Sequence, residues 1–240
     1  AMETGPVARH VPGGWSSTEI ALSDFTVRQE ADGKTKRLRG EEYLPRFLPV
    51  FVEHLRQKKW LDKTLLHICD EPANHNVVLW RKASDFVGRC APELRRLDAI
   101  ESPHFGDSLE VWVPKLDHLA SWQGAFEDAQ RRGKELWFYT VGIFQSGSLM
   151  NKTVDVPLID TRLMHWLNYR YDLKGYLHWG FNHWTSDPWN APGQHRGDGW
   201  HVYPKKDGLL NSLRWEQMRN GLQDCECLYL LEDKIRQIRA

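Results

Sequence analysis

The stretch Thr64-Leu65-Leu66-His67-Ile68-Cys69-Asp70-Glu71-Pro72 is a short apolar run that ends in two adjacent carboxylates and a proline. A run of this length, bounded by polar and turn-forming residues, predicts a strand that is buried on both faces. Adjacent carboxylates at the edge of an apolar core are costly unless water solvates them or the protein uses them. Pro72 also restricts Glu71 to extended conformations, which favours a fixed direction for its side chain.

The spacing of these residues leaves two interpretations open. In the first, the carboxylates form a solvated strand terminus and Asp70 caps the helix that follows. In the second, the chain turns after the strand, so that both carboxylates approach one pocket and carry out chemistry there.

Strands and helices alternate along the chain around this stretch. Short apolar runs predict strands, and apolar residues at helical spacing predict helices. The predicted strands lie at 64–69, 97–100, 109–113, 135–141 and 175–179. The predicted helices lie at 41–59, 84–94, 122–132, 158–171 and from 210 to about 238. We therefore expect an α/β protein whose parallel sheet is covered by helices.

Polar and aromatic residues gather just after several of these strands, at 70–71, 114–117, 139–140 and 179–184. Sites at the carboxyl ends of many parallel strands are typical of a (β/α)8 barrel of the TIM type. About five or six βα units are recognisable where a whole barrel needs eight, so we expect a partial or degenerate barrel with a long C-terminal helix. Residues 1–40 are expected to form an irregular and β-containing N-terminal segment, with a strand at 19–28, a turn at 31–34 and a second strand up to residue 39. Residues 41–240 are expected to form the barrel portion.

The composition argues against several classes of protein. The 240 residues carry 32 Lys+Arg and 32 Asp+Glu, and a formal net charge of zero is unusual for a nucleic-acid-binding chain. No apolar run approaches the ~18 residues of a transmembrane helix, and we expect no signal peptide at the start of the sequence. The four cysteines are too scattered for a disulfide framework. Neither a nucleotide-binding motif nor a set of metal ligands at suitable spacing is present, so we expect no cofactor and no metal.

The chain contains 12 tryptophans, a high content for a neutral protein. Tryptophan serves in a core, in an interface or as a stacking surface for sugars and other flat ligands, and composition alone does not choose among these uses. Trp179 and Trp184 flank Asn182 just after the last predicted strand, and Tyr139 lies near the end of the strand before it. We predict that at least two of these four side chains line a pocket.

The residues around Asp70-Glu71 also resemble the catalytic domain of glycoside hydrolase family 123. The resemblance extends through Val111-Trp112-Val113-Pro114, Leu136-Trp137-Phe138-Tyr139 and Gly175-Tyr176-Leu177-His178-Trp179, and it includes Asn182, Trp184 and Asp187-Pro188-Trp189. Its most specific segment is Ser212-Leu213-Arg214-Trp215-Glu216-Gln217-Met218-Arg219-Asn220-Gly221-Leu222-Gln223-Asp224, and the whole covers roughly residues 41–232. In this last segment we expect Arg214, Glu216, Arg219 and Asp224, with Arg162, to form a charged network that fixes the final helix.

The resemblance implies a retaining exo-β-N-acetylgalactosaminidase on a TIM barrel that acts by substrate assistance. The 2-acetamido oxygen of the sugar would attack the anomeric carbon, Asp70 would orient the acetamido group, and Glu71 would act as general acid and base. Tyr139 would donate a hydrogen bond to the acetamido oxygen. The residues assigned to substrate binding are Tyr139, Trp179, Asn182, Trp184 and Trp112. The resemblance further implies a secreted, periplasmic or cell-envelope protein.

Members of that family are normally much longer than this chain, with an N-terminal β-sandwich before a complete barrel. This sequence matches the pattern only from about the third barrel strand. We therefore expect a further N-terminal region or a partner chain to complete the barrel. A non-catalytic carbohydrate-binding or structural fragment stays open as the alternative function.

Overall fold

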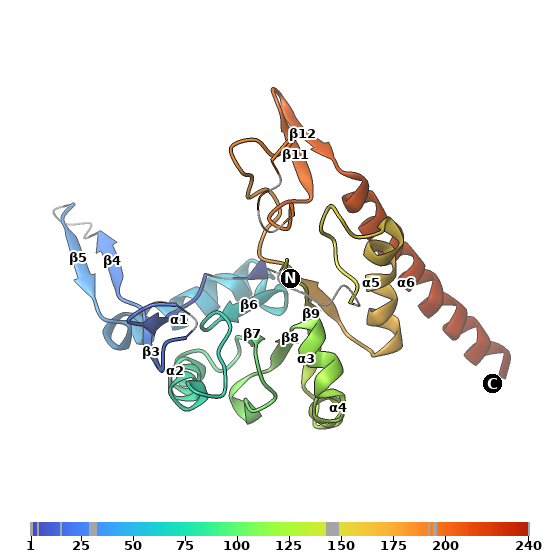
Figure 1. Cartoon of the computed structure of the whole chain (residues 1–240). Coiled ribbons are helices and arrows are strands. Elements are labelled where there is room, and N and C mark those ends of the chain that lie inside the picture. The colour runs from blue at the N-terminus through green and yellow to red at the C-terminus, as the bar shows by residue number, and fades with distance from the viewer. Residues whose placement is uncertain are drawn as a thin grey trace. The chain divides into compact units, whose positions relative to one another are not determined.

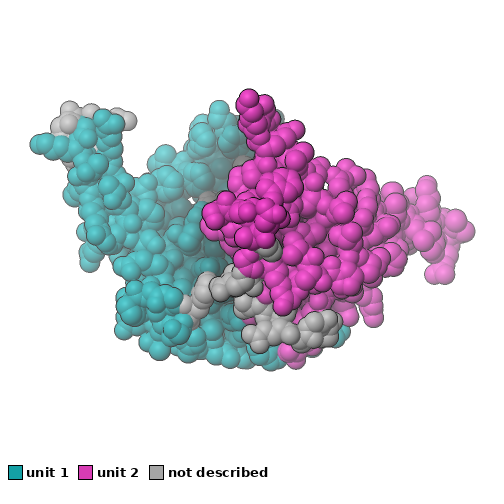
Figure 2. Space-filling model, turned by 45° about the horizontal axis from the view of Figure 1, so that its top comes forward, with its two compact units in different colours: residues 1–114, 122–135 teal, residues 115–121, 136–240 magenta. Residues whose placement is uncertain are grey.

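The apolar run from Thr64 forms strand β6 (Thr64–His67) in the computed structural model of the chain, and its first residues are buried. The structure describes residues 2–3, 5–14, 16–28, 33–142, 149–191, 193 and 196–239. The chain folds into two compact units. Unit 1 comprises Ala1–Pro114 and Trp122–Glu135, and unit 2 comprises Lys115–Ser121 and Leu136–Ala240 (Figure 2).

Unit 1 contains a parallel sheet. Strand β6 pairs with β1 (Met2–Glu3) on one side and with β7 (Arg96–Ile100) on the other, and β7 pairs with β8 (Val111–Pro114). All of β8 and all of β7 except its first residue are buried, as expected for parallel strands that are covered on both faces. The strands predicted at 64–69, 97–100 and 109–113 are confirmed, with small shifts at their ends.

The helices of unit 1 are α1 (Gly40–Gln57), α2 (Val77–Cys90) and α4 (Gln123–Arg131), with short 3₁₀ turns η1 (Leu61–Lys63) and η2 (Gly106–Ser108). Helix α1 continues through Pro45 and Pro49 and buries a stripe of apolar residues at helical spacing. Helix α2 begins earlier than the predicted start at residue 84, because Val77 and Trp80 extend its buried face.

In the N-terminal segment, the strand predicted to end near residue 39 is confirmed. The segment contains two antiparallel pairs, β2 (Ala8–Val11) with β3 (Glu19–Leu22), and β4 (Phe25–Arg28) with β5 (Thr35–Leu38). The prediction of a single strand over 19–28 is wrong, because residues 23 and 24 separate β3 from β4 and each strand pairs with a different partner.

Unit 2 contains the parallel strands β9 (Glu135–Tyr139, whose first residue belongs to unit 1) and β10 (Gly175–Leu177). Its antiparallel pair is β11 (Val202–Lys205) with β12 (Gly208–Asn211). Its helices are α3 (Leu116–Ser121), which was not predicted, α5 (Leu158–Arg170) and the long α6 (Leu213–Arg239).

The α/β class and the long C-terminal helix are confirmed. In the described ranges, the parallel strands are β1, β6, β7 and β8 in unit 1 and β9 and β10 in unit 2. This set is compatible with the expected partial barrel, and it does not confirm a closed barrel of eight strands.

Helices α5 and α6 lie side by side in unit 2 (Figure 1). Arg162 on α5 donates to both carboxylate oxygens of Asp224 on α6, at 2.7 and 2.8 Å, and Trp166 donates its indole N–H to the same carboxylate at 3.0 Å. Gly221 allows this approach, because a Cβ there would lie 2.2 Å from the carbonyl oxygen of Arg162. The predicted charged network is therefore confirmed for Arg162 and Asp224.

The remaining members of that network do not bond to charged groups on another helix. Arg219 pairs with Glu216 on the same helix at 2.5 Å. Arg214 donates to the backbone carbonyl oxygens of Lys152 and Gly197, at 2.7 and 2.8 Å. These two bonds tie the first turn of α6 to loops of unit 2 instead of to another charged side chain.

Replacing Gly221 by alanine should lower the free energy of unfolding by about 1–3 kcal/mol, because the added methyl group would force α5 and α6 apart. Urea unfolding followed by circular dichroism measures this change. Gly124 on α4 is the matched control: a Cβ there meets nothing within 4 Å, so Gly124→Ala should leave the stability unchanged or raise it slightly. Equal stability of Gly221→Ala and the wild type would contradict the close approach of the two helices.

Candidate functional site

Asp70 and Glu71 directly follow β6, at the carboxyl end of a strand in the parallel sheet of unit 1. Asp70 is exposed and Glu71 is half-buried. The backbone of Glu71 has a φ of +47°, in the left-handed region, which costs a non-glycine residue about 1 kcal/mol or more. The prediction that Pro72 keeps Glu71 extended is therefore wrong. A tight turn sets the direction of the two carboxylates.

The N-terminal part of unit 1 holds the backbone of this turn. Ala8, at the start of β2, donates its N–H to the carbonyl oxygen of Ile68 at 2.8 Å. His10 donates from Nε2 to the carbonyl oxygen of Asp70 at 2.7 Å. Asp70 does not cap the next helix, since the N-cap position of α2 is Asn76, so that part of the first interpretation is wrong.

A fully buried carboxylate lies next to the start of the turn. Asp98, in the middle of β7, accepts hydrogen bonds from the backbone N–H of Cys69 at 2.8 Å and from the indole N–H of Trp80 at 2.6 Å. Its other oxygen lies 3.0 Å from Nε2 of His67. Burial raises the pKa of Asp98 to about 6, and the hydrogen bond and charge of His67 oppose that rise. Since Cys69 immediately precedes Asp70, this carboxylate fixes the backbone where the turn begins.

In unit 2, three of the predicted residues lie on the segment that follows β10. The backbone around Asn182 pairs antiparallel with residues 199–201. Trp179 is 53% exposed, Asn182 is exposed and Trp184 is half-buried. Trp184 donates its indole N–H to the carbonyl oxygen of Val202 at 2.8 Å. The segment therefore presents Trp179 and Asn182 to solvent, while Trp184 is anchored to β11.

A second buried carboxylate, that of Asp198, binds Trp179. Its Oδ2 accepts the indole N–H of Trp179 at 2.6 Å, and its Oδ1 lies 3.1 Å from Nε2 of His178. The ammonium group of Lys152 lies 3.7 Å from Oδ1 and donates to the backbone carbonyl oxygen of Asp198 at 2.5 Å. Both members of this Lys–Asp pair are almost completely buried.

Burial and mutual interaction set the protonation of this cluster. Burial opposes the ionisation of Asp198, but hydrogen bonding and charge from His178, with the charge of Lys152, lower its pKa to about 2. Burial lowers the pKa of Lys152 to about 7, against the attraction of Asp198. Burial and the nearby cations also lower the pKa of His201 to about 2, so that imidazole is neutral at physiological pH.

Tyr139 and Trp112 are much less accessible than the sequence suggested. Tyr139 ends β9 and is 4% exposed. Trp112 is 1% exposed in the core of unit 1, edge-to-face with Phe105 and Phe126 at centroid distances of 6.2 and 6.3 Å. Its indole N–H is bonded to the carbonyl oxygen of Leu109 at 3.1 Å. This is the placement of a core residue, and we leave Trp112 out of the proposed site.

The residues that hold these segments in place are not among the predicted site residues. Asp98 had a detectable signal, because a carboxylate in the middle of an apolar strand needs buried hydrogen-bond partners. Asp198 and Lys152 lie in loops, far apart in sequence, and no spacing rule pairs them.

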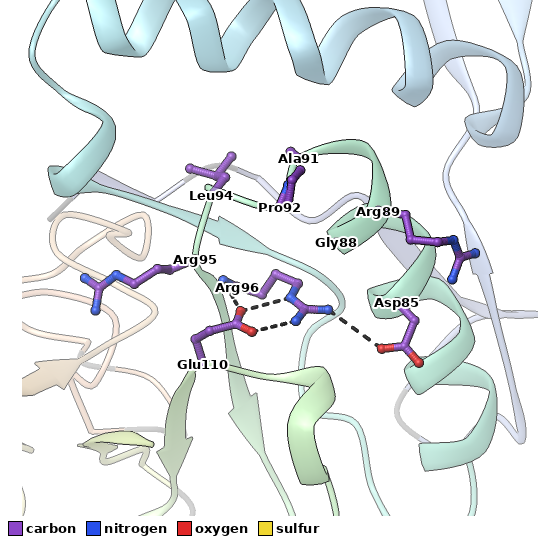
Figure 3. A pocket seen from close by; sticks show the side chains of 9 residues that line it. All are labelled: Asp85, Gly88, Arg89, Ala91, Pro92, Leu94, Arg95, Arg96 and Glu110. Carbon is purple, nitrogen blue, oxygen red and sulfur yellow. Dashed lines mark hydrogen bonds and ion pairs between the residues drawn. The ribbon is translucent and has the colours of Figure 1, made fainter. Parts of the chain in front are cut away.

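A pocket of about 550 Å³ in unit 1 lies at the opposite ends of the strands, where β7 begins (Figure 3). Its lining residues are Asp85, Gly88, Arg89, Ala91, Pro92, Leu94, Arg95, Arg96 and Glu110. Arg96 donates to the Glu110 carboxylate at 2.9 and 2.5 Å and to the carbonyl oxygen of Ser84 at 3.0 Å. These bonds join β7 to α2 and to the start of β8. Because active sites of βα barrels lie at the carboxyl ends of the strands, we assign this pocket a structural role.

Within the described ranges, no group of three or more His, Cys, Asp or Glu side chains is arranged to hold a metal ion. Nor is any described helix both long and apolar enough to cross a membrane. The cysteines at 69, 90, 225 and 227 are free thiols.

The parallel strands with their covering helices define an α/β protein, in an arrangement that is compatible with part of a barrel. The sequence model of the glycoside hydrolase 123 catalytic domain matches residues 13–231, and the chain belongs to this family. The match includes residues 13–40, upstream of the range over which the sequence analysis found the resemblance.

A solved structure of similar fold is a family 123 glycoside hydrolase from Clostridium perfringens. The TM-score is 0.66, the two sequences are 18% identical, and the alignment covers 90% of this chain and 40% of that chain. At this identity the likeness concerns the fold, and the chain spans less than half the length of that relative. No curated protein sequence matches the chain.

The role of Asp98 can be tested through stability. Asp98→Ala should lower the free energy of unfolding by about 3 kcal/mol, because the N–H groups of Trp80 and Cys69 lose their buried acceptor. Asp98→Asn should cost only about 1 kcal/mol, since one amide oxygen can still accept both bonds. Urea unfolding measures both, with the exposed Asp85→Asn as a control that should change little. If alanine and asparagine were equally costly, the hydrogen bonds would not be the source of the effect.

The depressed pKa of Lys152 predicts a pH dependence. The folded chain releases this proton near pH 7, whereas the unfolded chain keeps it up to the usual 10.5. Between these values the unfolded state binds more protons, so the contribution of Lys152 to stability rises with pH, by up to about 1 kcal/mol per pH unit. The measurement is urea unfolding of the wild type and of Lys152→Met at pH 7, 8 and 9. The free energy of unfolding of the wild type, relative to that of the variant, should increase as the pH rises. A difference between the two free energies of unfolding that does not change with pH would contradict the lowered pKa of Lys152.

Proposed function

We propose that this chain, or the longer protein that it represents, removes terminal β-linked N-acetylgalactosamine or a related 2-acetamido sugar by a retaining, substrate-assisted mechanism. The observation that carries the proposal is the pair Asp70-Glu71, which follows β6 within the region matched by the family. Retaining glycosidases use two carboxylates, and substrate-assisted families replace the protein nucleophile by the acetamido group of the sugar.

In the first step, the acetamido oxygen attacks the anomeric carbon while the bond to the leaving glycosidic oxygen breaks. Glu71 gives its proton to that oxygen, and Asp70 accepts a hydrogen bond from the acetamido N–H and stabilises the positive charge of the oxazolinium formed. In the second step, Glu71 takes a proton from a water molecule. The water oxygen attacks the same anomeric carbon and opens the oxazolinium ring. Each step inverts the configuration at the anomeric carbon, so the product keeps the configuration of the substrate.

The placement of the two carboxylates supports this division of roles. Glu71 is half-buried and Asp70 is exposed, so the two groups experience different surroundings although they are adjacent. Different surroundings are what separates an acid from a neighbouring carboxylate that stays ionised. The turn that carries both is held by Asp98 and by His10, which reduces the reorganisation needed during the reaction.

We assign sugar contacts within unit 2 to Trp179, Asn182 and Trp184, with Tyr139 as a hydroxyl donor. The exposed ring of Trp179 suits the apolar C–H face of a pyranose, and the Asn182 amide suits a sugar hydroxyl. Tyr139 is nearly buried, so a contact from it would involve only the tip of the side chain.

The alternative is a non-catalytic carbohydrate-binding or structural fragment. The observation that favours it is the exposed ring of Trp179, because an aromatic surface of this kind binds a sugar without a catalytic group. The two functions differ in the residue they depend on. Catalysis depends on Glu71, whereas binding alone depends on Trp179.

The test is hydrolysis of chromogenic β-N-acetylgalactosaminide, β-N-acetylglucosaminide and β-galactoside. We expect cleavage of acetamido sugars only, because the acetamido oxygen is the nucleophile. Glu71→Gln should lower kcat by roughly 10²–10⁴-fold while KM changes little, since it removes the proton donor and keeps the shape. Asp70→Asn should also lower kcat. The exposed Glu93→Gln is the matched control and should be fully active.

Cleavage of the plain β-galactoside would exclude the acetamido mechanism. Absence of turnover, together with sugar binding that survives Glu71→Gln and is lost in Trp179→Ala, would support the binding alternative instead. The Clostridium perfringens structure is described in connection with glycolipid glycan hydrolysis, and a glycolipid glycan therefore belongs among the substrates tested.

A further inference from the structure

Trp179 is an exposed aromatic ring that is held in one orientation. It is 53% exposed, and Oδ2 of Asp198 binds its indole N–H at 2.6 Å. The ring edge packs on the backbone of Gly199, where a Cβ would lie 3.0 Å from Cη2 of the indole. The rings of His178 and His183 also lie near it, at centroid distances of 5.9 and 5.3 Å. A tryptophan fixed in this way presents the part of its apolar surface that stays exposed in a single position.

The backbone next to the ring is tied to the same carboxylate. Nδ1 of His178 lies 3.0 Å from both the backbone nitrogen and the carbonyl oxygen of Gly180, and Nε2 of the same ring lies 3.1 Å from Oδ1 of Asp198. The residues on both sides of Trp179 are thus connected to Asp198, as is the indole itself.

Burying the Asp198 carboxylate, which holds the ring, costs free energy because the ion loses its hydration. The side chain of Asp198 is 1% exposed and that of Lys152 is 0% exposed. Burying an ion pair often stabilises a fold no more than apolar side chains of the same size, because both ions lose their water. A neutral carbonyl group could accept an indole N–H without that loss. The buried pair is therefore better explained by the geometry it imposes than by stability.

We infer that Asp198 is a positioning residue for sugar binding: it fixes the indole of Trp179 as a stacking surface for the apolar face of a pyranose, and Lys152 is its buried counter-ion. The inference rests on the proposed function, because it assumes a carbohydrate ligand at Trp179. The side chain of Asp198 is 1% exposed, so it influences a ligand through the orientation of Trp179 and not by direct contact. A ring ordered before binding does not have to be ordered by the ligand, which is worth roughly 3- to 10-fold in affinity for one side chain.

The first measurement is the Kd for free N-acetylgalactosamine, by calorimetric titration. Asp198→Asn keeps the shape of the side chain and removes its charge, and Trp179→Phe keeps a ring and removes the N–H. Each should weaken binding about 3- to 10-fold, and the double variant should bind no more weakly than the weaker single variant. In a Trp179→Ala background, Asp198→Asn should have no further effect. Asp155→Asn, an exposed carboxylate paired with Arg196, is the matched control and should bind as the wild type does.

The second measurement does not involve the sugar. The indole N–H of Trp179 gives an NMR resonance that is identified by its loss in Trp179→Phe. Its exchange with solvent should be slow in the wild type and about 10-fold faster or more in Asp198→Asn. If Asp198→Asn does not fold, Trp179→Phe still tests whether the N–H bond contributes to affinity.

The two measurements separate the possible failures. Unchanged indole exchange in Asp198→Asn, or equal Kd values for the wild type and Trp179→Phe, would overturn the inference. So would an Asp198→Asn effect of the same size with and without the Trp179 ring, because the role would then be structural only. Indole exchange that depends on Asp198, in a wild type that binds no acetamido sugar, would overturn the proposed function and the sugar-positioning role with it.

Discussion

Hydrogen bonds to a buried carboxylate fix the backbone or the side chains of both sets of candidate residues. In unit 1, Asp98 binds the N–H that precedes the Asp70-Glu71 turn, and in unit 2, Asp198 binds the indole of Trp179. A carboxylate accepts several strong hydrogen bonds at once, which suits it to hold a turn or a ring. It destabilises a core unless it is given partners. Each of the two carboxylates accordingly has an imidazole and an indole N–H as partners. For Asp98 these are His67 and Trp80. For Asp198 they are His178 and Trp179.

Much of the fold could be predicted because the sequence patterns that indicate its strands and helices lie within single short segments. The apolar runs of β6, β7 and β8 are nearly continuous, as in strands buried on both faces, and the apolar spacing of α1 outweighed two prolines. The position of Asp70 and Glu71 at a strand end followed from the same run. The family was recognisable from long motifs, above all the segment from Ser212 to Asp224, which forms the start of α6.

What could not be predicted depends on contacts between residues distant in sequence. Trp112 resembled a ligand-binding tryptophan until its neighbours Phe105 and Phe126 were known, since a side chain on a strand faces either the site or the helices. The left-handed backbone of Glu71 contradicts the local preference before proline, because tertiary hydrogen bonds hold the turn. The pairing of Lys152 with Asp198 joins two loops, where no periodicity exists to reveal it.

The two units are interleaved along the chain, because residues 115–121 belong to unit 2 before residues 122–135 return to unit 1. The returning segment includes α4, whose Phe126 packs edge-to-face on Trp112 in the core of unit 1. No single cut therefore divides the sequence into two contiguous pieces that each hold a whole unit. A cut before residue 115 would remove α4 from the core it completes, and a cut after residue 135 would separate α3 from the rest of unit 2, so a variant that keeps both units whole has to keep the two together.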